Sequence, residues 1–222
     1  MITRSALVCL VLFTAIVLTA GHPAAHAQTA DAQLADAVFD RLLAKYNAID
    51  ALRAEFTQTM SSSYMEQDES FTGVLILQGE KFRIETGTEV LVVNGQETYV
   101  YRPGEQQVLI NDVVEDEASF LPTEFLLNHD ERFDVLDVDD VSFNGERHFR
   151  LNLKPKDAGS FFREATLWMR DRDDIITKLT VLDVNETRMI FTLDNIELNP
   201  TLDAGTFSFT PPDGVEVIDL RS

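Results

Sequence analysis

Side chains able to do chemistry are few in this sequence and lie far apart. His129 and His148 are the only histidines beyond the N-terminal segment, and neither has a second histidine at metal-ligand spacing. The single cysteine, Cys9, lies within an apolar run near the start of the chain. A zinc site needs several such ligands together, so none is expected. The motifs of serine hydrolases, zinc proteases and nucleotide-binding loops do not occur either.

Carboxylates are the one abundant reactive group, and two runs of them stand out. Asp137-Val138-Asp139-Asp140 and Asp171-Arg172-Asp173-Asp174 both fall where turns are expected between strands. Neither run matches the EF-hand calcium loop, so calcium binding there is an alternative to ordinary solvated surface charge. We therefore expect a protein that is not an enzyme and that holds no metal and no cofactor.

The first residues have the pattern of a secretory signal peptide. Arg4 precedes an almost wholly apolar stretch over residues 5–20, and Ala25-His26-Ala27 supplies small residues at the spacing that signal peptidase cleaves. The apolar stretch is short for a membrane-spanning helix, which makes an uncleaved anchor the weaker alternative. Cys9 does not lie at the cleavage point, so no lipid anchor is expected. We predict a signal peptide over 1–27, cleavage near Ala27, and one exported domain over 28–222.

The charge balance is strongly acidic, with 38 Asp and Glu against 18 Lys and Arg and a formal net charge of −20. Such a surface repels nucleic acid and anionic lipid headgroups, so we expect no nucleic-acid partner. A basic protein partner would suit this surface. General solubility or a salty environment would explain it equally well.

Hydrophobic periodicity predicts one helix followed by many short strands. Leu34, Val38, Leu42 and Tyr46 repeat at helical spacing, which predicts a helix over Asp31–Asn47 with Asp31 as its N-cap. Beyond it, alternating segments separated by turn residues predict about eleven antiparallel strands. The expected strands are Leu52–Met60, Phe71–Gln78, Lys81–Thr86, Val90–Asn94, Thr98–Arg102, Gln107–Asn111, Phe133–Val138, Arg147–Lys154, Glu164–Arg170, Ile175–Val184 and Thr187–Ile196. A short helix is expected in the insert between residues 112 and 130, after Pro122.

Most of these strands have one apolar face and one polar face, and too few helices follow to cover the apolar one. The sheet must then fold into two packed layers or curl into a barrel-like shape. Val74–Leu77 is apolar on both faces, and the helix over Asp31–Asn47 is the candidate to cover its outside. A curled sheet could be filled by its own side chains or could hold a lipid, and the pattern alone leaves both open.

The order of several short motifs resembles a known family. These motifs are Ala54-Glu55-Phe56-Thr57-Gln58, Phe71–Leu77, Lys81–Glu85, Leu91–Gly95, Thr98–Pro103 and Phe207-Ser208-Phe209-Thr210-Pro211-Pro212-Asp213-Gly214-Val215. Together they resemble the periplasmic outer-membrane lipoprotein carrier family, LolA. The resemblance implies a mainly β member of the α+β class, an unclosed antiparallel barrel with an N-terminal helix and a short helical lid. It also implies a periplasmic role, in which acylated lipoproteins pass from an inner-membrane ABC exporter to an outer-membrane receptor. We expect such a carrier to act as a monomer.

The resemblance assigns candidate lipid-binding residues. The expected cavity lining is Leu75, Leu77, Phe82, Ile84, Leu91, Val93, Tyr99 and Tyr101, and the expected apolar side of the lid is Phe120, Leu121, Phe125 and Leu126. Plain core packing is the alternative for each of them. Two other classes of function stay open, a periplasmic sensor of lipid or protein with the same fold and an interaction protein with a filled interior.

One position departs from the family pattern. The family usually carries an Arg-Pro pair shortly before the residue that corresponds to Phe82, whereas this chain has Gln78 and Gly79. The family's arginine is associated with holding the lid shut and with release of cargo. Gln78 is neutral and forms weaker hydrogen bonds than arginine. Lid control would then rest on Gln78 itself or on a substitute such as Arg83 or Lys81.

Overall fold

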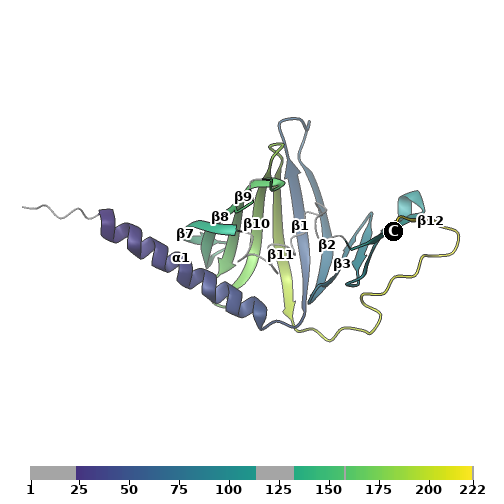
Figure 1. Cartoon of the computed structure of the whole chain (residues 1–222), viewed down its shortest axis with the longest axis horizontal. Helices are drawn as coiled ribbons and strands as arrows, with labels where there is room; N and C mark the ends of the chain where they lie inside the picture. Colours follow the sequence, from purple (N-terminus) through teal and green to yellow (C-terminus); the bar gives the residue numbers. More distant parts are fainter. Residues whose placement is uncertain (1–23, 114–132, 158, 222) are drawn as a thin grey trace, which may run out of the picture.

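The computed structural model describes residues 24–113, 133–157 and 159–221, which form one helix and one large sheet (Figure 1). Helix α1 spans Ala24–Asn47. The sheet has twelve strands in the order β12-β6-β5-β4-β3-β2-β1-β11-β10-β9-β8-β7. The expected lid residues Phe120, Leu121, Phe125 and Leu126 lie outside the described residues, as does the apolar stretch of the expected signal peptide.

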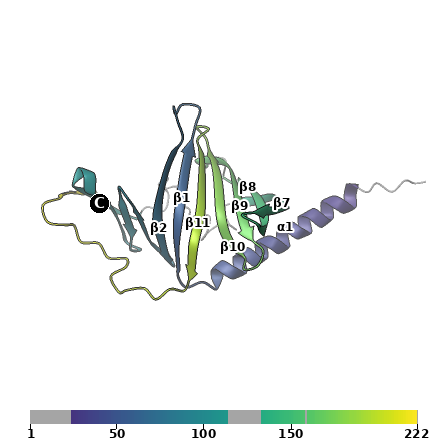
Figure 2. The ribbon, with the colours of Figure 1, turned by 180° about the vertical axis from the view of Figure 1, so that it is seen from behind.

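Two antiparallel meanders build this sheet. The first comprises β1 (Leu52–Ser61), β2 (Glu69–Gln78), β3 (Lys81–Thr86), β4 (Val90–Val93), β5 (Glu97–Arg102), the short 3-10 helix η1 (Pro103–Glu105) and β6 (Gln107–Asp112). The second comprises β7 (Phe133–Phe143), β8 (Glu146–Pro155), β9 (Phe162–Arg170), β10 (Ile175–Asp183) and β11 (Arg188–Leu198). A last strand, β12 (Glu216–Asp219), follows them. Seen from behind, the long β1–β2 hairpin projects beyond its neighbours (Figure 2).

Pairing of β1 with β11 joins the two meanders, from Leu52 opposite Leu198 to Ser61 opposite Arg188. The sheet ends at β12 on one side and at β7 on the other, and these two strands do not pair with each other. An open sheet of mainly antiparallel strands is thus confirmed. All eleven expected strands are present. The twelfth, β12, was missed because it is short, follows a double proline and runs parallel to β6 at the edge.

The register assigns each side chain to one of two faces, because successive residues of a strand point to opposite sides. We call inner the face that carries Phe56, Leu75 and Leu193, and outer the opposite one. Leu193 lies opposite Phe56, and Leu75 lies opposite both Ala54 and Ile84. In the second meander the inner face includes Leu151, Leu167, Leu179 and Val181, all buried in one continuous hydrophobic cluster.

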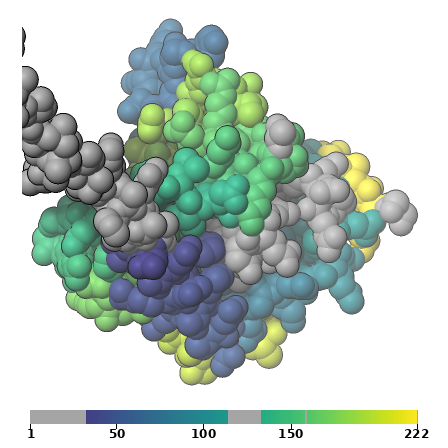
Figure 3. Space-filling model, turned by 60° about the vertical axis from the view of Figure 1, so that its left-hand side comes forward, coloured from purple at the N-terminus to yellow at the C-terminus, as the bar shows by residue number. Residues whose placement is uncertain are grey.

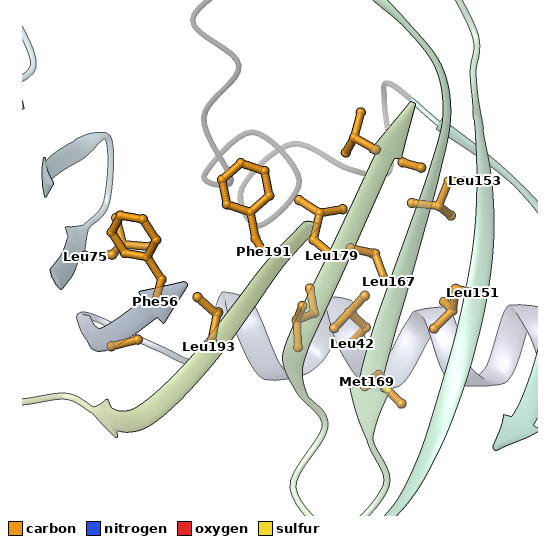
Figure 4. Close-up of a cluster of buried hydrophobic side chains, with 14 of the residues drawn as sticks. Leu42, Phe56, Leu75, Leu151, Leu153, Leu167, Met169, Leu179, Phe191 and Leu193 are labelled. Carbon is orange, nitrogen blue, oxygen red and sulfur yellow. The ribbon is translucent and has the colours of Figure 1, made fainter. Parts of the chain in front are cut away.

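Helix α1 packs on the inner face of the second meander. Its Val38 and Leu42 are buried in the same cluster as Leu167 and Leu179 (Figure 4). In the space-filling view the purple helix lies directly against the teal and green strands of this meander (Figure 3). The expectation that this helix covers the outside of Val74–Leu77 was therefore wrong. An apolar stripe predicts that a helix is packed, but not which face of a sheet receives it.

The helix also begins earlier than expected, at Ala24 instead of Asp31. Alanines at 24, 25, 27 and 30 have the highest helix propensity of any residue, so the helix continues through the expected cap. Asp31 is an interior residue of α1 and does not cap it. Cleavage near Ala27 would leave the packed part of the helix, from Ala35 onward, intact.

The segment after β11 runs along the outer side of the first meander before it ends in β12 (Figure 1). The ring of Phe209 contacts those of Tyr99 and Tyr101, each at 5.7 Å between centroids. The guanidinium of Arg83 donates a hydrogen bond to the carbonyl oxygen of Thr206 at 3.3 Å. The C-terminal segment therefore covers the outer face of β3 to β6, and the inner face of this meander is left to other contacts.

Candidate functional site

A pocket opens on the inner face where β1 to β4 meet β11. It encloses about 590 Å³, including space open to solvent. Its walls are Phe56, Gln58, Phe71, Leu75, Ile84, Thr86, Glu89, Leu91, Phe191 and Leu193. Figure 4 shows four of these residues, Phe56, Leu75, Phe191 and Leu193, beside the buried leucines of the second meander.

Register alone explains the apolar wall of this pocket. Leu193 pairs with Phe56, Leu75 pairs with Ile84, and Ile84 pairs with Leu91. Cross-strand partners have neighbouring side chains on one face, so five strands place a row of apolar groups side by side. Helix α1 does not cover this row, because it lies over the other meander.

Gly73 makes room for the largest of these side chains. It lies directly opposite Phe56, and a Cβ atom at this position would lie only 2.7 Å from the Phe56 ring and 2.4 Å from the carbonyl oxygen of Glu85. Glycine in a strand often marks such a close approach. The Phe56 ring can therefore lie against the backbone of β2, where it also meets the edge of Phe71 at 6.3 Å.

One end of the pocket is polar. Gln58 and Phe71 pair toward the turn of the β1–β2 hairpin, and Thr86 and Glu89 lie at the neighbouring β3–β4 turn. The Thr86 hydroxyl accepts the backbone N–H of Glu89 at 3.0 Å and donates to its carbonyl oxygen, so it is used by the turn. Glu89 Oε2 accepts a hydrogen bond from Nε of Arg102 at 3.0 Å. The pocket is thus amphipathic, apolar along its length and polar at one end.

The residues predicted to line a cavity divide into three groups. Leu75, Ile84 and Leu91 line the pocket. Leu77, Phe82 and Val93 share the inner face but are buried in the hydrophobic cluster, 5%, 8% and 5% exposed. None of these three lines the pocket, although Leu75, which does, belongs to the same cluster.

Tyr99 and Tyr101 lie on the outer face, so this part of the prediction was wrong. Tyr99 pairs with Val92 and Tyr101 with Val90, whereas the inner position of β5 opposite Leu91 belongs to Val100. Both tyrosines pack against Phe209 of the C-terminal segment. The resemblance gave these tyrosines a lining role, but the register places them on the face that the C-terminal segment covers.

The two residues expected to control the lid also lie on the outer face. Gln78 pairs with Lys81 at the end of the β2–β3 hairpin, and Arg83 pairs with Ile76. Arg83 is held by Glu85 at 2.5 Å and by the Thr206 carbonyl oxygen. From there Arg83 binds the C-terminal segment, so a role for it or for Gln78 at the pocket is not supported.

Sequence reasoning missed seven pocket residues as candidates: Phe56, Gln58, Phe71, Thr86, Glu89, Phe191 and Leu193. Phe191 and Leu193 alternate with polar residues along β11, but nothing local in the sequence indicates that β11 pairs with β1. Their contribution depends on a contact between residues far apart in the chain.

Ion pairs fasten α1 to the end of the second meander. Nη2 of Arg41 lies 3.1 Å from Asp171 and 2.5 Å from Asp174, and the guanidinium also stacks 5.5 Å from the Phe149 ring. Burial alone would lower the pKa of Arg41, but the hydrogen bonds to both aspartates outweigh it and raise this pKa. One turn further on, Tyr46 Oη accepts the backbone N–H of Ile176 at 3.1 Å. Burial raises the pKa of this phenol, which stays neutral.

Neither carboxylate run forms a cation site. Within the described ranges, no group of three or more His, Cys, Asp or Glu side chains is placed to hold a metal ion. Asp171 and Asp173 are paired with arginines, and so are Asp139 and Asp140. The calcium alternative therefore finds no support at these turns. In the same part of the chain, no helix has both the length and the hydropathy needed to cross a bilayer.

Comparison with known proteins agrees with this geometry. The family model described as outer membrane lipoprotein carrier protein LolA matches residues 47–210. An outer-membrane lipoprotein carrier protein of Bordetella avium is 28% identical over 195 residues, covering 84% of this chain and 90% of the relative. One from Idiomarina loihiensis is 27% identical over 176 residues, covering 76% and 81%.

Among solved structures, an uncharacterized conserved protein from Thermus thermophilus superposes with a TM-score of 0.55. It is 13% identical and covers 83% of this chain and 98% of its own, so it shows a shared fold. An open sheet with an apolar pocket on its inner face defines a binding protein of the open-barrel class. Because the family model spans most of the sequence, this chain belongs to the LolA family of outer membrane lipoprotein carrier proteins.

Proposed function

We propose that this protein is a periplasmic carrier that binds the acyl chains of lipoproteins in the inner-face pocket. In this proposal a signal peptide directs export and is cleaved near Ala27. The carrier then receives acylated lipoproteins from an inner-membrane ABC exporter and passes them, as a monomer, to an outer-membrane receptor. Membership of the LolA family and relatives named as carriers support this role.

The apolar pocket between β1–β4 and β11 is the observation that carries the proposal. Each methylene of an acyl chain moved out of water gains about 0.8 kcal/mol, so a multiply acylated protein does not leave a membrane unaided at a useful rate. A carrier must offer an apolar surface of comparable quality. The row formed by Phe56, Leu75, Leu193 and their neighbours provides one without any covalent chemistry.

Partial exposure of this pocket suits release as well as binding. Phe71 is 39% exposed at its rim, and part of the enclosed space is open to solvent. Acyl chains held there keep some contact with water, so they bind less strongly than in a bilayer interior. A downstream acceptor with a deeper apolar site would then draw the cargo onward.

A release assay tests this proposal. Purified protein is added to spheroplasts that make a radiolabelled lipoprotein, and lipoprotein in the supernatant is measured. We expect the wild-type protein to release lipoprotein and Leu91→Glu to release almost none, because a carboxylate in the pocket opposes acyl binding.

Thr88→Glu is the matched control. Thr88 is exposed in the adjacent β3–β4 turn, so this substitution adds the same charge outside the pocket. It should retain release. If Leu91→Glu releases as much lipoprotein as the wild-type protein, and circular dichroism shows that both variants are folded, acyl chains do not bind in this pocket.

A further inference from the structure

The polar end of the pocket carries hydrogen-bonding groups that the fold itself does not use. Gln58 is half-buried in the pocket wall, and its backbone takes part in the sheet and accepts the Ser70 hydroxyl at its carbonyl oxygen. Among the residues that the structure describes, the Gln58 carboxamide has no hydrogen-bond partner. A half-buried polar group normally has one, so this carboxamide is available to a ligand.

Glu89 contributes a second group at the same end. Its Oε2 is engaged by Arg102, while within the described ranges Oε1 has no hydrogen-bond partner. A carboxylate oxygen only accepts, whereas the Gln58 carboxamide both donates and accepts. A ligand group that uses both residues therefore offers an N–H or O–H donor and an acceptor oxygen.

The charge of Glu89 further restricts which ligand groups can bind at this end. A fatty-acid carboxylate or a lipid phosphate would bring a negative charge beside Glu89, in a chain whose formal net charge is already −20. Two negative charges that lie side by side repel each other. A neutral linkage avoids this cost. An ester offers a carbonyl oxygen but no N–H, while a secondary amide offers both.

We propose that Gln58 and Glu89 select cargo by the amide that links an acyl chain to its headgroup, so that the site prefers N-acyl amides over esters and free fatty acids. The Gln58 carboxamide donates to the amide carbonyl oxygen, and Glu89 Oε1, a separate group, accepts the amide N–H, which points the opposite way in a trans amide. The acyl chain then runs along Leu75, Ile84 and Leu91. This inference rests on the proposed function and adds a specificity determinant to it.

Displacement of Nile red, a neutral hydrophobic dye, tests the inference. The competitors are N-methyldodecanamide, methyl dodecanoate and dodecanoate, which share one chain and differ only in the polar group. We expect the amide to bind about three- to tenfold more tightly than the ester, the effect of one additional hydrogen bond. Dodecanoate should bind most weakly of the three.

Two variants locate this preference. Glu89→Met keeps the side-chain length and removes the acceptor of the amide N–H, so it should reduce the amide-to-ester ratio to about one. Gln58→Met removes only the donor to the carbonyl oxygen, which amide and ester share, so it should weaken both competitors and leave the amide preferred. Thr57→Val, on the outer face one residue away, should leave the ratio unchanged. Reading the ratio rather than the affinity separates selectivity from any general gain or loss of apolar binding.

The outcomes distinguish the two levels of the account. If all three competitors displace the dye equally, or if Glu89→Met keeps the wild-type ratio, the specificity proposal is overturned while acyl binding stands. If no competitor displaces the dye from the folded protein, acyl binding itself fails, and the proposed function with it.

Discussion

Docking of α1 depends on Arg41, and replacing this residue with methionine should loosen the helix without unfolding the sheet. Met keeps much of the apolar stem that lies over Phe149 but removes the charge that pairs with Asp171 and Asp174. The Arg41 side chain is 40% exposed, so its ion pairs are partly screened by water. Partly exposed charge-assisted hydrogen bonds of this kind contribute about 1–2 kcal/mol in total.

Hydrogen exchange at one amide reports this loss locally. The N–H of Ile176 donates to Tyr46 Oη, so it becomes accessible when the C-terminal part of α1 leaves the sheet. A loss of about 1–2 kcal/mol corresponds to roughly 5- to 30-fold faster exchange. Amides in the middle of β1, which do not contact the helix, serve as the internal control and should change little.

A double-mutant cycle assigns the effect to the ion pair. Arg41→Met and Asp174→Asn should each weaken docking, and their coupling energy should be about 0.5–1 kcal/mol at low salt. At about 1 M salt the coupling should shrink, because the Debye length falls to about 3 Å. An unchanged exchange rate at Ile176, or zero coupling at low salt, would refute the reasoning.

Two further predictions concern the pocket wall and the C-terminal strand. Gly73→Ala should destabilise the fold by about 1–3 kcal/mol in urea unfolding and weaken Nile red binding, because the new Cβ would meet the Phe56 ring and the β3 backbone. Unchanged stability and binding would show that neither the Phe56 ring nor the β3 backbone has to move. Hydrogen bonds from Arg221 hold the pKa of Asp219 at about 2, below its ordinary 3.8, so the stability that this pair gives β12 is present above about pH 3.8 and is lost as the pH falls toward 2. An NMR titration of the Asp219 carboxyl should show this midpoint, and Arg221→Met should return it toward 3.8; a midpoint already near 3.8 in the wild type would contradict the pairing.

Local patterns predicted the strands well because alternation and turn residues act over short distances. Lys81–Thr86 was predicted with its observed bounds, and most other strands differ by one to a few residues at an end. The inner face of β2 to β4 followed from the same alternation. The sequence therefore predicts Leu75, Ile84 and Leu91 in the pocket wall, where the structure has them.

The errors arise where the answer depends on distant parts of the chain. Tyr99 and Tyr101 face outward because Phe209, more than a hundred residues later in the sequence, covers that side of β5. The half of the sheet that receives α1 depends on long-range contacts such as Arg41 with Asp174. Periodicity within one strand or helix does not indicate which distant part of the chain packs against it.

Gln58 shows a different limit. It belongs to one of the motifs that resemble the family, but it is polar and is not among the candidate lipid-binding residues. Only the register, with Gln58 opposite Phe71 on the inner face, shows that the pocket has a polar end. A search of the sequence for apolar residues alone could not identify Gln58.

Site-specific photo-cross-linking tests the central claim most directly, that acyl chains occupy the inner-face pocket. A benzoylphenylalanine is introduced in place of Leu91, in the pocket, or in place of Lys178, which stacks on Trp168 on the outer face. After irradiation of cells, adducts are identified by mass spectrometry.

The account predicts adducts with acylated lipoproteins from position 91 and none from position 178, and their loss when the acylated cysteine of the cargo is replaced. Adducts of equal yield at both positions, or lipoprotein adducts at position 91 that survive removal of the acyl chains, would contradict it.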